Sequence, residues 1–192
     1  MSEDDLIRAM RRCFTAELDQ VVEAADAAHG VPSVVANWRL SDRDREALLR
    51  YGVPINRGDT RGAQLVGDVQ SELDPTVLVG DRPGYRLGSH WWRKLAALAG
   101  SGKVVAIAPD ESEDPLGKLA VGTPPTYVNS SVARFVDVAW RWNYLMPLFR
   151  AADYSNAFYE GTEEFLDALP TLDPALAEEE EYPWWRNLVL GW

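Results

Sequence analysis

The stretch YVNSSVARFVDVAWRW, residues 127–142, constrains the fold more than any other part of the sequence. Directly before Asn129 stands a short, strand-like segment next to turn residues, whereas after Asn129 apolar residues recur at helical spacing. Asn and Ser side chains can accept hydrogen bonds from the first backbone N–H groups of a helix, which have no partner within that helix. We therefore predict a strand followed directly by a helix, with Asn129 or Ser130 as the cap.

The predicted helix after Asn129 has two apolar faces. One face carries Val132, Phe135, Val136, Ala139, Trp142, Met146 and Phe149, and the other carries Val138, Leu145 and Leu148. Two such faces are typical of a helix buried between a sheet and other helices, so we expect Phe135 and Trp142 in the core. Pro147 either kinks this helix or ends it near Leu145, because proline removes a backbone donor.

Further helices are predicted at both ends of the chain. Residues 4–28 form one amphipathic stripe that ends before Gly30 and Pro32, and Cys13 lies on it as a buried, unreactive thiol. A second, short helix fits SDRDREALLRYG, with Ser41 as its cap. Near the C-terminus two more helices are predicted, one at TEEFLDALP and one at DPALAEEEEYPWWRNLVL. Pro183 is expected to break the second one before Trp184 and Trp185.

Residues 53–126 have a different character. Glycine and proline separate short apolar pieces: AQLVGDV, TVLVG, YRLG, KVVAIAP and KLAVG. Strand-length pieces bounded by turn residues indicate a mostly antiparallel sheet, with KVVAIA at its centre as the most apolar piece. The intervening SHWWRKLAALAGSG is expected to be partly helical. The chain of 192 residues is thus predicted to be one α+β domain, a mostly antiparallel sheet backed by helices with a helical C-terminal region.

The charge is concentrated in one segment. The chain has a net charge of −11, and ten acidic residues without a single Lys or Arg lie between Ala151 and Glu181. Such a field repels phosphate backbones, so we expect no nucleic-acid binding. It attracts a basic partner, although a solvated face that only keeps the protein soluble has the same composition.

Catalytic and metal-binding patterns fail on inspection. GSGKV at 100–104 lacks the earlier glycine and the Ser or Thr of a phosphate loop, and DESEDPLGKLAV has Pro115 and Val121 where a calcium loop needs Gly and Glu. His29, His90 and Cys13 share no ligand spacing. We therefore expect no catalytic residue, metal or cofactor, and no enzyme activity. One cysteine, an acidic start and no apolar run of about 18 residues predict a cytoplasmic protein without a membrane segment.

The order of the motifs resembles the fourth group of the SUKH superfamily of bacterial immunity proteins. The resemblance runs from about Leu40 to Trp185, through LLRYGVP, YRLG, KVVAIA, YVNSSVARFVDVAW, LDPAL and YPWW, and departs from the family at residues 88–101. It implies a single SUKH-like domain over residues 1–192 with no catalytic site. It also implies that the protein neutralises a cognate toxin, a nuclease or a nucleic-acid deaminase, delivered between competing bacteria. A non-catalytic adaptor or regulatory module without a toxin stays open as the alternative.

The residues expected to bind the partner follow from charge and aromatic content. A basic toxin domain would meet the acidic loop and the acidic C-terminal run, and an exposed tryptophan would suit a protein interface. Trp91 and Trp92 would point to opposite sides of a strand, so one of them can be exposed. The predicted partner-binding residues are Asp110, Glu111, Glu113, Asp114, Glu178, Glu179, Glu180, Glu181 and Trp92.

Overall fold

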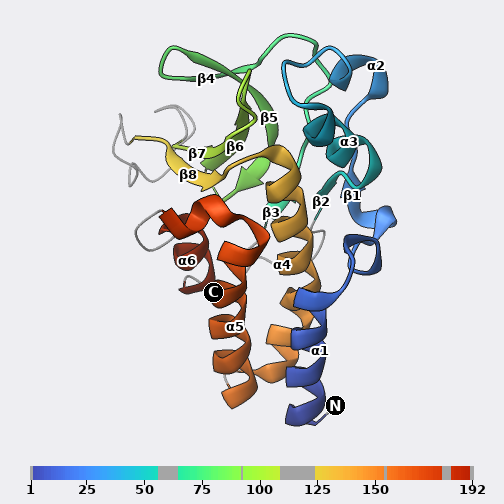
Figure 1. Ribbon diagram of the computed structural model, residues 1–192, viewed down its shortest axis with the longest axis vertical. Helices are drawn as coiled ribbons and strands as arrows, with labels where there is room; N and C mark the ends of the chain where they lie inside the picture. The colour runs from blue at the N-terminus through green and yellow to red at the C-terminus, as the bar shows by residue number, and fades with distance from the viewer. Residues whose placement is uncertain are drawn as a thin grey trace.

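The protein has a β-sheet at one end and three long helices that run side by side away from it (Figure 1). The computed structural model describes residues 2–55, 65–91, 93–108, 124–153, 155–178 and 183–190. The long helices are α1 (Glu3–Thr15), α4 (Val132–Ala152) and α5 (Asn156–Leu172), and each contacts the other two. This arrangement confirms the predicted α+β class with a helical C-terminal region.

The main sheet is antiparallel, as the sequence predicts. Its strands are β3 (Leu65–Gly67), β4 (Val77–Val79), β5 (Arg82–His90), β6 (Arg93–Leu98), β7 (Val104–Ile107) and β8 (Thr126–Asn129). The strand order is β3-β5-β6-β7-β8. Strand β4 lies on the same edge of β5 as β3: β4 pairs with the start of β5 and β3 pairs with its end. A separate two-stranded sheet joins β1 (Ala27–Ala28) to β2 (Val53–Pro54).

The central strand is β6, and the expectation of partial helix in residues 88–101 is wrong. Leucine and alanine favour helices by propensity, but Leu95, Ala96, Ala97 and Leu98 are all buried, at most 3% exposed. A strand covered on both faces shows a continuous apolar run instead of alternation. Hairpin pairing on both sides holds β6 extended, and the strand of KVVAIA, β7, lies next to it, one place from the centre.

Helix α4 begins one or two residues later than the two predicted caps would place it. Its cap is Ser131, whose hydroxyl accepts a hydrogen bond from the Arg134 N–H at 3.2 Å, so neither Asn129 nor Ser130 is the cap. Asp44 of helix α3 (Asp42–Arg50) also accepts from the Ala133 N–H at 2.8 Å. Two of the unpaired donors of the first turn are thereby satisfied, one by the neighbouring residue and one by another helix.

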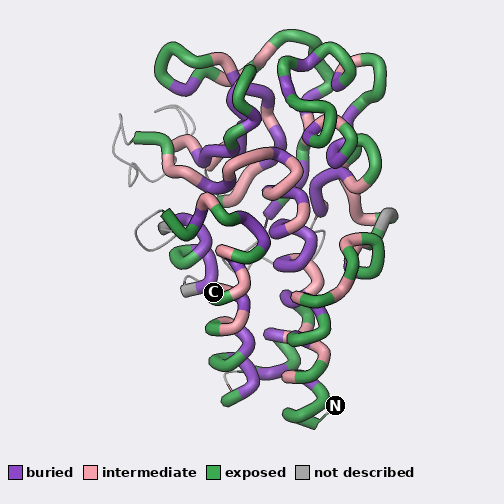
Figure 2. Tube along the Cα trace, in the orientation of Figure 1, coloured by how far each residue is buried: buried purple, intermediate pink, exposed green. Residues whose placement is uncertain are grey.

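The body of α4 agrees with the prediction. Phe135 is 0% and Trp142 1% exposed, and the helix buries side chains around most of its circumference. Of the two alternatives for Pro147, ending the helix near Leu145 is wrong, since α4 continues through the proline to Ala152. Figure 2 shows buried positions along α4 and the inner strands, and exposed positions on the outer sides of α1 and α5.

Helix α1 is much shorter than the predicted 4–28. It ends at Thr15, and the 3₁₀ turns η1 (Leu18–Gln20) and η2 (Ala24–Asp26) follow. The guanidinium of Arg141, on α4, donates hydrogen bonds to the carbonyl oxygens of Cys13 and Ala16. A tertiary contact thus occupies the carbonyl groups at the end of the helix, which periodicity alone could not indicate.

The remaining helices complete the fold. Ser41 caps α3 as predicted, with its hydroxyl accepting from the Asp44 N–H at 3.2 Å, and the short helix α2 (Pro32–Val35) precedes it. After α5 come the 3₁₀ turn η4 (Pro174–Glu178) and helix α6 (Pro183–Leu190), which starts at the proline as expected. Within the described residues, no helix has both the length and the apolar character needed to cross a membrane.

Candidate partner-binding surface

Most of the predicted partner-binding residues lie outside the described part of the chain. This is the case for Asp110, Glu111, Glu113, Asp114, Glu179, Glu180, Glu181 and Trp92. Glu178 is described, and its side chain is exposed at the end of η4. The partner-binding role of all nine residues stays a prediction.

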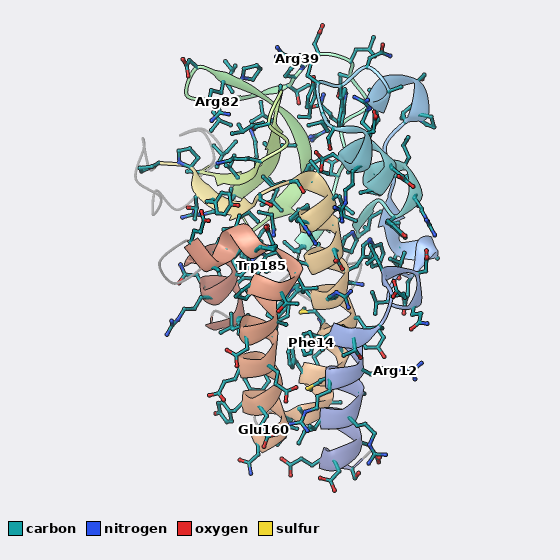
Figure 3. All side chains as sticks on the ribbon, viewed as in Figure 1. Arg12, Phe14, Arg39, Arg82, Glu160 and Trp185 are labelled. Carbon is teal, nitrogen blue, oxygen red and sulfur yellow. The ribbon has the colours of Figure 1, made fainter. Side chains whose placement is uncertain are left out.

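The acidic segment continues along α5, where it forms an exposed row. Glu160, Glu163 and Asp167 are exposed and follow a spacing of three and four residues, which brings them to one side of the helix. We call these three residues the α5 acidic face. Tyr159 beside them is 56% exposed. Figure 3 labels Glu160 at the end of α5 that lies far from the sheet.

Helix α1 neutralises one edge of this face. Arg11 donates to Glu164 at 2.6 Å and lies 3.9 Å from Glu160. The hydrogen bond and the charge of Glu164 raise the pKa of the Arg11 guanidinium. Arg12, next in sequence, points into solvent (Figure 3). In the part of the chain that the structure describes, no ion pair involves Glu163 or Asp167. Their negative charge is therefore available to a partner.

Asp173 belongs to the same acidic segment but not to its surface. Its side chain is 0% exposed and accepts hydrogen bonds from the Asn129 amide at 2.9 Å and from the Ser130 N–H and hydroxyl at 2.8 and 2.6 Å. The indole of Trp185, labelled in Figure 3, donates to the Val128 carbonyl and to the Asn129 side-chain oxygen, both at 3.2 Å. This carboxylate therefore fastens β8 to the C-terminal helices.

One tryptophan differs from the others that the structure describes. Trp91 is 60% exposed, whereas Trp38, Trp140, Trp142, Trp184 and Trp185 are at most 4% exposed. It follows directly after β5, and its predecessor His90 packs edge-on against Trp184 of α6 at 5.5 Å between ring centroids. The sequence allowed one of the adjacent pair to be exposed. Trp92, the residue predicted for the interface, lies outside the described residues, and Trp91 is the one that the structure shows exposed.

The candidate groups for chemistry are separated or buried. In the described ranges, no three His, Cys, Asp or Glu side chains gather as a metal site would require. Cys13 is 1% exposed, and burial raises the pKa of its thiol to about 12 despite the nearby charge of Arg141. A thiol that stays protonated is a poor nucleophile, so the predicted buried and unreactive state agrees with this environment.

The comparisons with known proteins identify the family. The fold is an α+β fold with a helix-backed antiparallel sheet. A family model described as SUKH-4 immunity protein matches residues 15–190, nearly the whole chain, so the chain belongs to this family and has an immunity-protein role. The match extends the resemblance seen in the sequence and starts at the last residue of α1. Neither the curated proteins nor the solved structures contained a match.

Proposed function

We propose that this protein binds a cognate toxin domain and neutralises it by protein–protein interaction, without catalysis. The observation that carries the proposal is the family match over residues 15–190. We further propose that residues 1–192 act as a single domain in the cytoplasm, where a toxin would meet its substrates.

The charge distribution supports a basic toxin that acts on nucleic acid, a nuclease or a deaminase. Such proteins bind phosphate groups through basic surfaces. The chain carries a net charge of −11, and the α5 acidic face presents Glu163 and Asp167 without ion pairs among the described residues. An acidic partner seated over a phosphate-binding surface would exclude the substrate. The same charges would accelerate encounter with the toxin and disfavour acidic partners.

The test uses the toxin domain encoded beside this gene. Expression of that domain alone should stop growth, and co-expression with this protein should restore growth and yield a complex that co-purifies. Addition of this protein to the purified domain should abolish its nuclease or deaminase activity at a molar ratio of one to one. The matched control is an unrelated acidic protein of similar size, which should neither restore growth nor inhibit the domain.

Two outcomes would contradict the proposal. If the two proteins form a complex but the toxin stays active, the chain is an adaptor that binds without neutralising. If neutralisation needs far less than one equivalent of this protein, the mechanism is catalytic destruction of the toxin or of its product. A separate outcome concerns only the toxin class. If this protein restores growth against a toxin that does not act on nucleic acid, the neutralising role stands and only the inference of the toxin class from charge is refuted.

A further inference from the structure

The outer side of α5 carries a row of three exposed residues. Tyr159, Glu163 and Asp167 follow one another at intervals of four residues, so they lie one above another along the helix. We call these three residues the outer row of α5. The inner side of the helix, which packs against α1 and α4, consists of the buried residues Ala157, Phe158, Gly161, Phe165, Leu169 and Leu172.

Tyr159 is the aromatic residue of this row, and packing accounts for little of its side chain. It is 56% exposed, whereas the neighbouring rings of Phe149, Phe158 and Phe165 are at most 8% exposed. Its ring meets the Phe158 ring edge-on, at 5.5 Å between centroids, and its hydroxyl has no hydrogen bond to another described residue. Tyrosine is also a weaker helix former than alanine or glutamate. Helix stability therefore gives no reason for a tyrosine at this position.

The charge beside Tyr159 is negative locally, and not only for the chain as a whole. Helix α5 has no Lys or Arg and four acidic residues: Glu160, Glu163, Glu164 and Asp167. Arg11 binds Glu164 and approaches Glu160, which neutralises the edge of α5 that faces α1. The exposed arginines of α4 and α6, Arg150 and Arg186, pair with neither acid of the outer row, and no other described residue does. The outer row thus combines an exposed ring with two carboxylates that have no described counter-ion.

We propose that the outer row of α5 is a docking face for the toxin, with Tyr159 as its anchor and an arginine or lysine of a basic toxin segment packed over the tyrosine ring. This inference rests on the proposed function. Tyrosine is enriched among the residues that dominate binding energy, and its ring face attracts cations. Glu163 and Asp167, which follow along the same side of the helix, balance the charge of the same segment. A second copy of this chain fits the face poorly, because it would place two rows of acids against each other.

Tyr159→Ala tests the anchor through the two rates of binding. The variant should melt at the temperature of the parent or higher, since it loses little buried surface and gains a better helix former. Its dissociation from the toxin domain encoded beside this gene, measured by surface plasmon resonance, should become about 10-fold faster or more. Its association rate should change by less than about 2-fold, because the acids that attract the toxin are still present.

Two further variants define the role of the ring. Tyr159→Phe keeps the ring and should dissociate within about 3-fold of the parent rate. The matched control is Leu78→Ala, which also removes an exposed apolar side chain, since Leu78 is 71% exposed. Leu78 belongs to β4, at the far end of the molecule from the start of α5 (Figure 1). Both of its binding rates should equal those of the parent.

The possible failures are distinct. If the parent protein does not bind the toxin domain, the proposed function fails, and this inference fails with it. If the parent binds and Tyr159→Ala dissociates as slowly, the proposed function stands and the anchor role is refuted. A Tyr159→Ala variant that loses stability and affinity together would also overturn the inference, because Tyr159 would then be a structural residue.

Discussion

The carboxylate of Asp173 accepts two hydrogen bonds from Ser130, one from the backbone N–H at 2.8 Å and one from the hydroxyl at 2.6 Å. The two residues lie 43 positions apart in the sequence. Ser130 stands between the last residue of β8 and the cap of α4, and Asp173 stands between α5 and η4. These two hydrogen bonds therefore hold the junction between β8 and α4 against the junction between α5 and η4.

Asp173→Ala should destabilise the fold by about 3 kcal/mol or more. The substitution leaves the Ser130 N–H and the buried Asn129 amide without their acceptor, and each unsatisfied buried donor costs about 1–3 kcal/mol. Chemical denaturation measures the loss. Ser131→Ala is the control at the same junction, since loss of an N-cap costs about 1 kcal/mol. Equal losses in the two variants would show that Asp173 has no role beyond an ordinary cap.

Gly161→Ala should lower the melting temperature, although alanine is the better helix former. Gly161 lies inside α5, where a methyl group would come within 2.3 Å of the Met10 sulfur and 2.9 Å of a Phe149 ring carbon. Both neighbours are buried, so overpacking of about 1–3 kcal/mol outweighs a propensity gain of about 1 kcal/mol. Thermal denaturation provides the measurement. The losses of Gly161→Ala and Met10→Ala should be less than additive in the double variant, because the truncated Met10 side chain makes room for the methyl group. A stabilised single Gly161→Ala variant would contradict the close crossing of α1 and α5.

Cys13 makes the stability depend on pH in the alkaline range. Burial raises the pKa of its thiol from 9.0 to about 12, so above pH 9 the unfolded chain releases this proton more readily than the folded protein. The contribution to stability is complete below pH 9 and falls between pH 9 and 12, by at most about 1.4 kcal/mol per pH unit. The measurement is the unfolding free energy of the parent and of Cys13→Ala across this range. Parallel slopes for the two proteins, or rapid labelling of the native thiol at pH 7, would refute the assignment.

The sequence predicts α4 well because its signal is local. The spacing of Phe135, Trp142 and their neighbours reports burial directly, and capping serines stand at the start of the helix. The choice between Asn129, Ser130 and Ser131 as the cap was not local. Asp173 and Trp185 bind the side chains of the first two residues from elsewhere in the chain, which leaves Ser131 for the cap.

The other differences between the expectation and the structure have the same origin. Pairing on both sides determines that Leu95–Leu98 is a strand, against its helical composition, and Arg141 occupies the carbonyl groups where α1 ends. For the candidate surface, composition located the acidic segment but could not separate buried Asp173 from exposed Glu163. The exposure of Trp91 depends on the hairpin turn between β5 and β6. The sequence did not predict this turn, because the segment was expected to be partly helical.

Removal of the α5 acidic face should slow association with the toxin domain without weakening the complex much once it has formed. The variant is Glu160→Gln, Glu163→Gln and Asp167→Asn together, because single exposed charges contribute only about 0–1 kcal/mol each. At low salt the association rate should fall several-fold, since charges at the rim of an interface act on encounter more than on dissociation. In about 1 M salt the Debye length shrinks to about 3 Å, and the rates of variant and parent should converge. A second variant, in which Glu178, Glu179, Glu180 and Glu181 are all replaced by Gln, tests the predicted acidic C-terminal run in the same way.

The control for this prediction removes the same charge elsewhere. Glu17→Gln, Glu72→Gln and Asp81→Asn also replace three exposed acids, so the net charge changes equally in both triple variants. If only the net charge of the protein matters, both triple variants should associate more slowly to the same extent. If the α5 acidic face attracts the toxin locally, only the α5 variant should associate more slowly. Stopped-flow association rates across a salt series distinguish these results. If the α5 variant and the parent associate equally fast at every ionic strength, the acidic residues of α5 serve solubility and the partner binds elsewhere.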